Sequence, residues 1–406
     1  MQKFEKHSPV VVTEVTTKHE LRQFMQYPNR LYADNPNYIP SFYGDDLSDW
    51  TPGKNPAFDY CEARCWLARR DGEIVGRIGA ILSHKANDKF GTHRMRFSQV
   101  DFVDDSEVSA ALFGTVERWA REKGCDQVHG PLGFTDMDRE GMLVGGFDRR
   151  SLFFTNYNAP YYLEHLTRLG YRKDVDWIEY RITVPEPGGA EAERLHKLSE
   201  FILKRKHLHV ATVHHKSEYG PFVRQVFELV NAAYAPLYGV VELSDEQIER
   251  YANKFIPLVD PDFVCFVVDE QDQLVAFGVT ALDPSVALKH SDGRLFPFGW
   301  AGVLNDLHHS DTLIMLLTAV RPDLQAEGIN AVMMDHVCQS CNRHGVRFAE
   351  TGPMLELNDH ILAQWKRLEK EQHKRRRCFI KDLDHDVNAA NAAAAQTETP
   401  ETESAE

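Results

Sequence analysis

No apolar run in the sequence reaches the roughly 20 residues that a membrane-spanning helix needs. The first residues, MQKFEKHSPVVVTEV, also lack the apolar centre of a secretion signal. We therefore expect a cytoplasmic protein without integral membrane association. The seven cysteines stand at irregular spacing, as expected for free thiols in a reducing compartment.

The sequence also has fewer basic than acidic residues. The chain has 46 Lys and Arg against 61 Asp and Glu, which gives a formal net charge of -15. Nucleic-acid binding needs a basic face that neutralises phosphates, so this balance predicts no nucleic-acid partner. Residues 385–406 contain no Lys or Arg, and we interpret them as a disordered acidic tail. The basic run Lys374–Arg377 is interpreted as an exposed face that pairs with acids elsewhere.

Several catalytic motifs are missing as well. The sequence contains no Walker loop, no HExxH motif and no G-x-S-x-G motif. No residues stand at a spacing that indicates zinc or magnesium ligands, so no metal is predicted. Cys338 and Cys341 have redox spacing, but they lie in an expected helix and are interpreted as ordinary thiols.

One pattern occurs twice in the chain. CWLARRDGEIVGRIGAIL begins at Cys65 and CFVVDEQDQLVAFGVTAL begins at Cys265, 200 positions later, and both predict a β-hairpin. Two amphipathic helical patterns that end at Gly124 and Gly345 form a second matching pair. We therefore predict a mixed α/β fold made of two copies of one unit that pack on each other.

Each copy is expected to run strand, two helices, hairpin, strand, helix, strand, helix, strand. A chain of 406 residues with 43% apolar residues is large enough for two such globular units. The predicted division is a first domain at 1–184, a linker at 185–195, a second domain at 196–384 and the tail at 385–406.

The segment RPDLQAEGIN, Arg321–Asn330, links an apolar strand pattern to a helical pattern. The first N–H groups of a helix have no partner within the helix, and they favour an anion. Gly328 leaves room for a phosphate oxygen, Ile329 would anchor the turn and Gln325 would brace it. The alternative is a plain strand-to-helix turn in which Gly328 only relieves backbone strain.

VRPDLQAEGINAVMMDHV resembles the Gln/Arg-x-x-Gly-x-Gly/Ala signature of the acyl-CoA-dependent N-acyltransferases of the GNAT superfamily. The resemblance implies a GNAT fold and acetyl-CoA or a longer acyl-CoA as co-substrate. It also implies a splayed strand at Met315–Val320 that holds the pantetheine arm. Asn330 departs from the signature, which usually has Gly or Ala there. The cofactor-binding residues implied are Leu317, Ala319, Val320, Gln325, Ala326, Glu327, Gly328, Ile329 and Asn330.

Three further segments are similar to a group of uncharacterised tandem GNAT-like bacterial proteins. These segments are GRLFPFG, QHKRRRC and the stretch from Gly130 to Tyr162. Some members are labelled GTP cyclohydrolase, which no metal ligand set supports here, and some resemble bacterial ceramide synthases that acylate a sphingoid amine. The first half lacks the signature and carries Asp104 and Asp105 where the loop would lie, so we interpret it as a degenerate copy that binds no CoA.

N-acylation needs a base for the amine and a proton for the departing thiolate. The helical pattern HILAQWKRLEK lacks the tyrosine that often serves as acid in this superfamily, and Glu350 and Tyr157 are the candidate catalytic residues. The alternative, which the pattern favours, is that Glu350 is a solvated strand end or a partner for Arg347. Acceptor-binding candidates in the first half are Asp136, Asp138 and Tyr161. Phe298 of the second half could wall a groove for the acyl chain. All four could also be surface or packing residues.

The sequence therefore predicts an N-acyltransferase that moves an acetyl or longer acyl group directly to a small-molecule or lipid-like amine. Direct transfer is favoured because no cysteine or serine has an evident neighbouring base. The alternative is a non-catalytic acyl-CoA-binding or scaffolding protein. The acceptor, the acyl length and the oligomeric state stay open.

Overall fold

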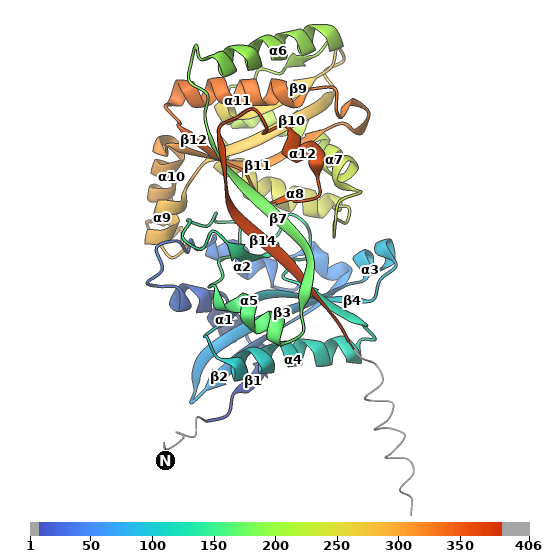
Figure 1. The fold of residues 1–406 in the computed structure, drawn as a ribbon, viewed down its shortest axis with the longest axis vertical. Helices are drawn as coiled ribbons and strands as arrows, with labels where there is room; N and C mark the ends of the chain where they lie inside the picture. Colours follow the sequence, from blue (N-terminus) through green and yellow to red (C-terminus); the bar gives the residue numbers. More distant parts are fainter. Residues whose placement is uncertain (1–7, 384–406) are drawn as a thin grey trace, which may run out of the picture.

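The computed structural model describes residues 8–383, in which helices cover both faces of one 14-stranded sheet (Figure 1). The first half comprises β1 (Val11–Glu14), α1 (Lys18–Leu31), α2 (Tyr43–Asp49), β2 (Cys61–Arg70), β3 (Glu73–Ser83), α3 (His84–Phe90), β4 (Arg94–Phe102), α4 (Ser106–Glu122), β5 (Gln127–Gly130), β6 (Met142–Gly145), α5 (Tyr161–Arg168) and β7 (Arg172–Thr183). The second half comprises α6 (Ala190–Lys206), β8 (His209–Val210), α7 (Gly220–Tyr234), α8 (Asp245–Phe255), β9 (Val264–Val268), β10 (Leu274–Leu282), α9 (Ser285–His290), α10 (Gly299–His309), β11 (Thr312–Val320), α11 (Asn330–His344), β12 (Phe348–Glu350), β13 (Met354–Leu355), α12 (Asp359–Ala363) and β14 (Lys370–Asp382). Between residues 8 and 383, no helix combines the length and the apolar character that crossing a membrane requires.

The two halves repeat one strand order, so the predicted duplication is confirmed. The order β1-β2-β3-β4-β5 in the first half matches β8-β9-β10-β11-β12 in the second. The predicted hairpins are β2–β3 and β9–β10, and Cys65 and Cys265 take equivalent places opposite Gly79 and Gly278. The second half has two helices, α9 and α10, between β10 and β11, where the first half has only α3 between β3 and β4.

The last strands of the two halves are exchanged. β14, from the second half, pairs with β5 of the first half, whereas β7 pairs with β12 of the second half. β7 and β14 also pair with each other, and they cross the molecule side by side in Figure 1. The halves therefore join edge to edge in one sheet rather than stacking two sheet faces, which leaves fewer unpaired strand edges.

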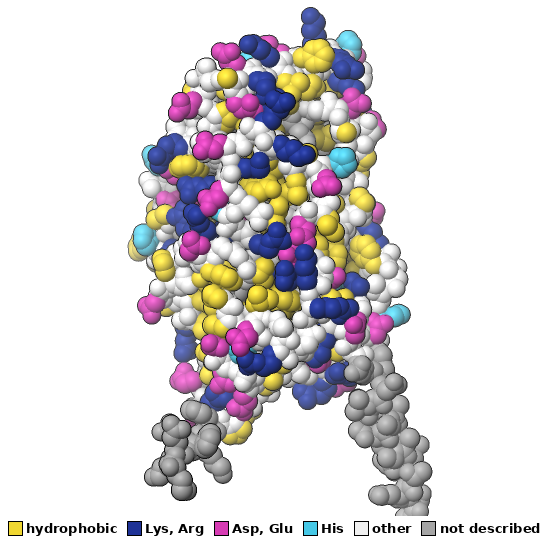
Figure 2. Space-filling model, in the orientation of Figure 1, with side chains coloured by type: hydrophobic (Ala, Val, Ile, Leu, Met, Phe, Trp, Pro, Cys, Tyr) yellow, Lys and Arg dark blue, Asp and Glu magenta, His cyan; other side chains and the backbone are white. Residues whose placement is uncertain are grey.

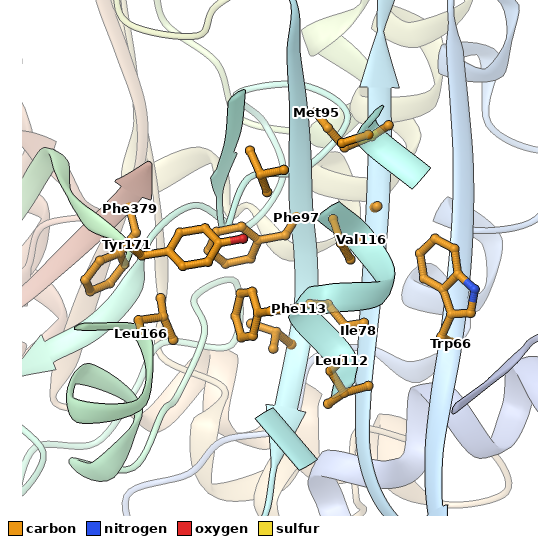
Figure 3. Packing of buried hydrophobic residues seen from close by; sticks show 14 of the residues in the cluster. Trp66, Ile78, Met95, Phe97, Leu112, Phe113, Val116, Leu166, Tyr171 and Phe379 are labelled. Atoms are coloured by element: carbon orange, nitrogen blue, oxygen red, sulfur yellow. The ribbon is translucent and has the colours of Figure 1, made fainter. Parts of the chain in front are cut away.

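The core of the first half holds this exchange in place. Phe379 of β14 belongs to the same buried cluster as Phe97, Phe113 and Tyr171 of the first half (Figure 3). Phe97 lies 5.2 Å from Phe113 and 5.7 Å from Tyr171, ring centre to ring centre. Burying one such aromatic ring contributes roughly 1.5–3 kcal/mol, so separating β14 from the first half would be costly.

Local sequence signals explain the ends of key helices. Thr17 and Glu20 form a capping box at the start of α1. Gly345 ends α11 with a φ of 70°, and Gly124 follows α4 with a φ of 74°, as predicted for both helix ends.

Charged residues of β14 alternate between solvent and interior. Arg375 and Arg377 both pair with Asp176 of β7, at 2.8 and 2.7 Å. Figure 2 shows Lys and Arg side chains mixed with Asp and Glu side chains over the face that it presents. Lys374 and Arg376 point inward and both pair with the buried Glu179. The prediction that the basic run pairs with acids elsewhere is confirmed, although every second member is buried.

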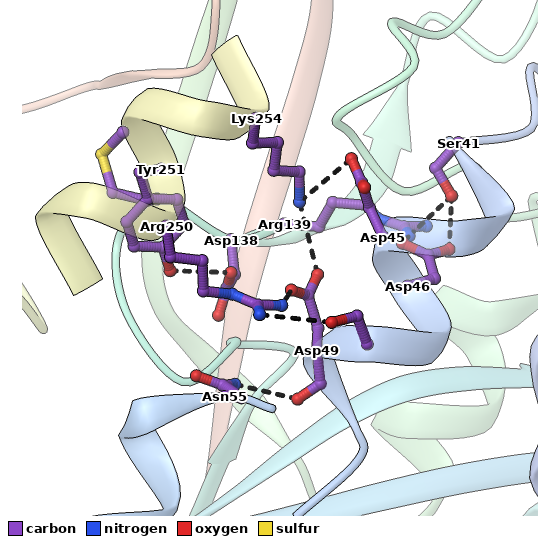
Figure 4. Close-up of polar contacts among 12 residues, drawn as sticks. Ser41, Asp45, Asp46, Asp49, Asn55, Asp138, Arg139, Arg250, Tyr251 and Lys254 are labelled. Carbon is purple, nitrogen blue, oxygen red and sulfur yellow. Dashed lines mark hydrogen bonds and ion pairs between the residues drawn. The ribbon is translucent and has the colours of Figure 1, made fainter. Parts of the chain in front are cut away.

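A second set of ion pairs ties α8 of the second half to α2 of the first (Figure 4). Arg250 contacts Asp49 at 2.5 Å, and Lys254 lies 3.4 Å from Asp49 and 3.8 Å from Asp45. These ion pairs and the exchange of β7 and β14 fix the position of the two halves relative to each other.

Candidate active site

A cavity of about 1630 Å³ runs along β11 and reaches from the second half into the first. The segment from Leu324 to Ala331, apart from Glu327, lines one part of it. The start of α11 and the segment around α12 line the same region. Asp136, Glu140, Asp174 and Trp177 line the part formed by the first half. The cavity therefore brings the predicted phosphate loop and the predicted acceptor loop into one continuous space.

The loop before α11 offers unpaired backbone donors to this cavity. Within the described part of the chain, the N–H groups of Ala326, Gly328, Ile329 and Asn330 have no hydrogen-bond acceptor. All four residues line the cavity. Free N–H groups at a helix start, with the positive end of the helix dipole, form a site suited to a phosphate.

The side chains of the loop support this backbone shape. Gly328 has a φ of 85°, and a Cβ there would lie 3.0 Å from Cδ1 of Ile202 on α6. Ile329 is buried, and Gln325 Nε2 donates to the carbonyl of Val320 at 3.2 Å. Glu327 points away from the cavity and pairs with Lys206 at 2.7 Å, an interaction that lowers its pKa. The acid in the loop therefore does not face the proposed anion.

The strand edge beside the loop is splayed. β11 pairs with β12 only from Thr312 to Ile314, and from Met315 to Val320 it pairs with β10 alone. Residues Met315–Val320, which include the predicted Leu317, Ala319 and Val320, line the cavity. Tyr234 at the end of α7 donates its hydroxyl to the carbonyl of Thr318 at 2.8 Å. The rest of this edge is available to an extended ligand that adds to the sheet.

Two carboxyl groups of the first half face the cavity. Burial, with the nearby charge of Asp138, raises the pKa of Asp136 to about 6 against the opposing charge of Arg96. Burial raises the pKa of Glu140 well above its usual range, and the charge of Asp136 adds to the effect. Above about pH 6 the Asp136 carboxylate is ionised, so it can attract a cation and accept its proton near neutral pH.

Asp138, which was predicted to bind the acceptor, is placed differently. It accepts hydrogen bonds from the backbone N–H groups of Phe134, at 2.8 Å, and Thr135, at 3.2 Å. The hydroxyl of Tyr251 donates to it at 3.2 Å (Figure 4). Its position indicates that it shapes the loop that carries Asp136, and it does not line the cavity.

The two predicted catalytic residues also lie outside the cavity lining. Ala349 of β12 faces the cavity, so the next residue, Glu350, points to the other face of the sheet. There it lies 3.2 Å from Lys374 Nζ, and burial raises its pKa. Tyr157 is buried against Tyr32, and its hydroxyl accepts from Asn35 Nδ2 at 2.7 Å. Contacts with residues that are distant in the sequence hold Glu350 and Tyr157 in these positions. A catalytic role for either residue stays a prediction.

Tyr161, predicted to bind the acceptor, and Phe298, predicted to wall an acyl-chain groove, do not line the cavity either. Tyr161 stacks on Tyr162 and donates its hydroxyl to the carbonyl of Phe102 in the first half. Phe298 precedes α10 and is 80% exposed. Glu140, one of the acids of the predicted acceptor loop, does line the cavity. The cavity is also lined by charged residues and tyrosines that local sequence patterns do not single out. They are Asp174, Tyr234, Tyr238, Arg194, Lys366 and Arg367.

One cysteine does lie beside a histidine, contrary to the expectation from the sequence. The potential ligand atoms of His129, Asp174 and Cys378 lie within 4.8 Å of one another. The hydroxyl of Tyr238 occupies their centre, donates to Asp174 at 2.5 Å and lies 3.1 Å from His129 Nδ1. Burial raises the pKa of the Cys378 thiol and lowers that of His129 well below its usual value. Cys378 therefore stays a buried thiol rather than a nucleophile.

Several solved structures share the fold of this chain. A tandem GNAT protein from the clavulanic acid biosynthesis pathway matches 92% of this chain and 99% of its own, with a TM-score of 0.52 and 13% identity. A GCN5-related N-acetyltransferase from Sphaerobacter thermophilus matches 93% of this chain and 97% of its own, with a TM-score of 0.50 and 13% identity. The chain has the tandem GNAT fold, as the resemblance predicted.

Two curated proteins are similar in sequence. Protein YghO of Escherichia coli (strain K12) is 27% identical over 379 residues, which cover 92% of this chain and 95% of the relative. A bacterial ceramide synthase of Caulobacter vibrioides is 28% identical over 300 residues, or 72% of this chain and 75% of the relative. No family model matches the chain.

Proposed function

We propose that the protein is an acyl-CoA-dependent N-acyltransferase that transfers an acetyl or longer acyl group directly to an amine. The observation that carries the proposal is the single cavity that joins unpaired loop N–H groups to a pair of carboxyl groups with raised pKa values. An anionic donor and a cationic acceptor would meet along the open edge of β11.

The donor side is formed by the second half. The N–H groups of Ala326, Gly328, Ile329 and Asn330 would bind the pyrophosphate, since a phosphate supplies the acceptors that they lack. The edge of β11 from Met315 to Val320 would bind the pantetheine arm by strand addition and align the thioester. Arg194, Lys366 and Arg367 add positive charge to the same cavity.

The acceptor side is formed by the first half. An alkyl amine is an ammonium ion near neutral pH, because its ordinary pKa is close to 10. The Asp136 carboxylate would attract this cation and accept one proton from it, with the Glu140 carboxyl group lining the same cavity. The freed lone pair would then attack the thioester carbonyl, and the carbon–sulfur bond would break with its electron pair on sulfur. The second nitrogen proton would pass to the thiolate, which leaves the amide and the free thiol as products.

The Caulobacter relative is named a ceramide synthase, which favours a lipid-like amine among the possible acceptors. The open splay in the second half and the contribution of both halves to one cavity are consistent with a donor and an acceptor bound at the same time. A direct transfer needs no protein nucleophile, and the buried Cys378 does not provide one.

Release of free thiol from acyl-CoA in the presence of an amine panel tests the proposal. Gly328→Glu should abolish the release, because it places a carboxylate among the loop N–H groups. Gly345→Glu is the matched control, since Gly345 has a similar φ of 70° at the far end of α11 and open space around it. Acyl-CoA binding without thiol release with any amine would instead indicate a non-catalytic binding module.

A further inference from the structure

A second, smaller cavity lies between the sheet of the second half and the helices α7 and α8. Apolar side chains and the ring of Tyr219 line it, with Val226 from α7, Ala252 from α8 and Val264 from β9 among them. Its volume of about 80 Å³ is roughly half that of an engineered apolar cavity of about 150 Å³ that stays dry and binds benzene. Such a space favours aliphatic carbon over water.

This apolar cavity shares a wall with the large one. Val279 of β10 and Leu316 and Leu317 of β11 line both cavities. The pairing of β10 with β11 shifts register between Val279 and Thr280, next to this wall. The apolar space therefore opens beside the strand segment that would align the thioester.

The acceptor loop lies at the same junction. Met137 lines the apolar cavity, whereas its neighbour Asp136 lines the large one. A thioester carbonyl bound at this junction would have the Asp136 carboxylate on one side and the apolar cavity on the other.

We infer that the apolar cavity receives the tail of an acyl chain longer than acetyl, with about three to five carbons beyond the carbonyl. The inference rests on the proposed function and specifies its donor class. The chain comes from the thioester, because the cavity wall belongs to β11 while the acceptor amine is drawn toward the acids. The cavity volume of about 80 Å³ sets the limit of chain length.

Calorimetric titration with CoA, acetyl-CoA, butyryl-CoA, hexanoyl-CoA and palmitoyl-CoA tests this directly. Each buried methylene should lower the Kd about fourfold from acetyl to hexanoyl, with no further gain at palmitoyl. Equal binding of acetyl-CoA and hexanoyl-CoA would overturn the inference, as would a gain that continues to palmitoyl-CoA. Binding of CoA in either case would show that the loop functions as proposed, whereas no binding of any probe would refute the proposed function itself.

Two variants locate the effect in the cavity. Ala252→Phe fills it, and should remove the preference for hexanoyl-CoA without changing the Kd of acetyl-CoA. Val226→Ala enlarges it, and should move the preference toward longer chains. Val303→Ala is the control, because it makes the same deletion at a buried position of α10 outside both cavities.

A further titration separates the two possible sources of an alkyl chain. Hexylamine added to the CoA-loaded protein should bind Ala252→Phe and the wild type equally. Loss of hexylamine binding in Ala252→Phe, with the acyl-CoA series unchanged, would assign the cavity to the acceptor and overturn the inference.

Discussion

The two halves place a strand, a turn and a helix in the same order, yet they treat the helix start differently. In the first half, Asp105 caps α4 by accepting from the N–H groups of Glu107, at 2.8 Å, and Val108. In the second half, no side chain caps α11, and the loop N–H groups face a cavity. In the first half, the Asp105 carboxylate therefore occupies the helix start. The equivalent helix start in the second half leaves room for an external anion.

The strands before these helices differ in the same way. β4 and β11 each pair with their parallel neighbour over only three positions, so both copies splay. In the first half, the hydroxyls of Tyr161 and Tyr162 bind the backbone of Phe102 at the end of β4. In the second half, most of the edge of β11 stays open to the cavity. The comparison supports the proposal that the second half binds the donor while the first half forms a wall of the same cavity.

The largest effect is expected at the base that the first half contributes. Asp136→Asn should lower the rate of thiol release about 100-fold or more while leaving acyl-CoA binding intact, because it removes the proton acceptor alone. Asp138→Asn provides the contrast within the same loop. It should lower the midpoint of urea unfolding, since it weakens two backbone hydrogen bonds, with little change in rate. Equal rates for Asp136→Asn and wild type would contradict the assignment.

The pH dependence of the rate follows from the raised pKa of Asp136. The carboxyl group is protonated below its folded pKa of about 6 and cannot then accept a proton. The rate should therefore fall as the pH decreases through about 6, and this limb should be absent from the residual activity of Asp136→Asn. A wild-type rate that is flat from pH 7 to pH 5 would exclude Asp136 as the base.

The raised pKa of Asp136 also lowers the unfolding free energy of the protein at high pH. Its folded pKa lies above the unfolded value, so the folded state binds the proton more tightly and loses stability as the pH rises through about 6. Asp136→Asn should thus unfold at a higher urea concentration than wild type at pH 8, with a smaller gain at pH 5. A lower midpoint at both pH values would indicate that the side chain serves the fold.

A smaller effect is expected at the capped helix of the first half. Asp105→Ala should cost about 1–2 kcal/mol of unfolding free energy, because it removes the cap of α4 and the ion pair with Arg70. Asp104→Ala is the control, since Asp104 is exposed and, among residues 8–383, forms an ion pair only with His165. Urea unfolding of both variants measures how much unfolding free energy each one loses. Equal losses would mean that the Asp105 side chain does not stabilise the start of α4, which would remove this difference between the two halves.

The smallest effect is expected for Tyr161→Phe. The carbonyl of Phe102 keeps the hydroxyl of Tyr162 as a partner, so the loss should stay at about 1 kcal/mol or less. Steady-state thiol release should be unchanged. An increase of fivefold or more in the KM of the amine would support the role in acceptor binding that the sequence suggested.

The sequence was sufficient for features that depend on neighbouring residues. The hairpins, the helix ends at Gly124 and Gly345, and the strand-loop-helix unit around Gly328 follow from local patterns. The exchange of β7 and β14 was not predicted, because strand pairing depends on contacts between distant residues. For the same reason Asp136 and Asp138 looked equivalent in the sequence, although only the first lines the cavity.

The number of acyl-CoA molecules bound by each chain tests the central claim most directly. Calorimetric titration of the wild type should show one site per chain with a Kd in the micromolar range, about −8 kcal/mol, and no binding to Gly328→Glu. Gly345→Glu should retain the site. Two sites per chain, or unchanged binding in Gly328→Glu, would contradict the claim that only the second half holds the donor.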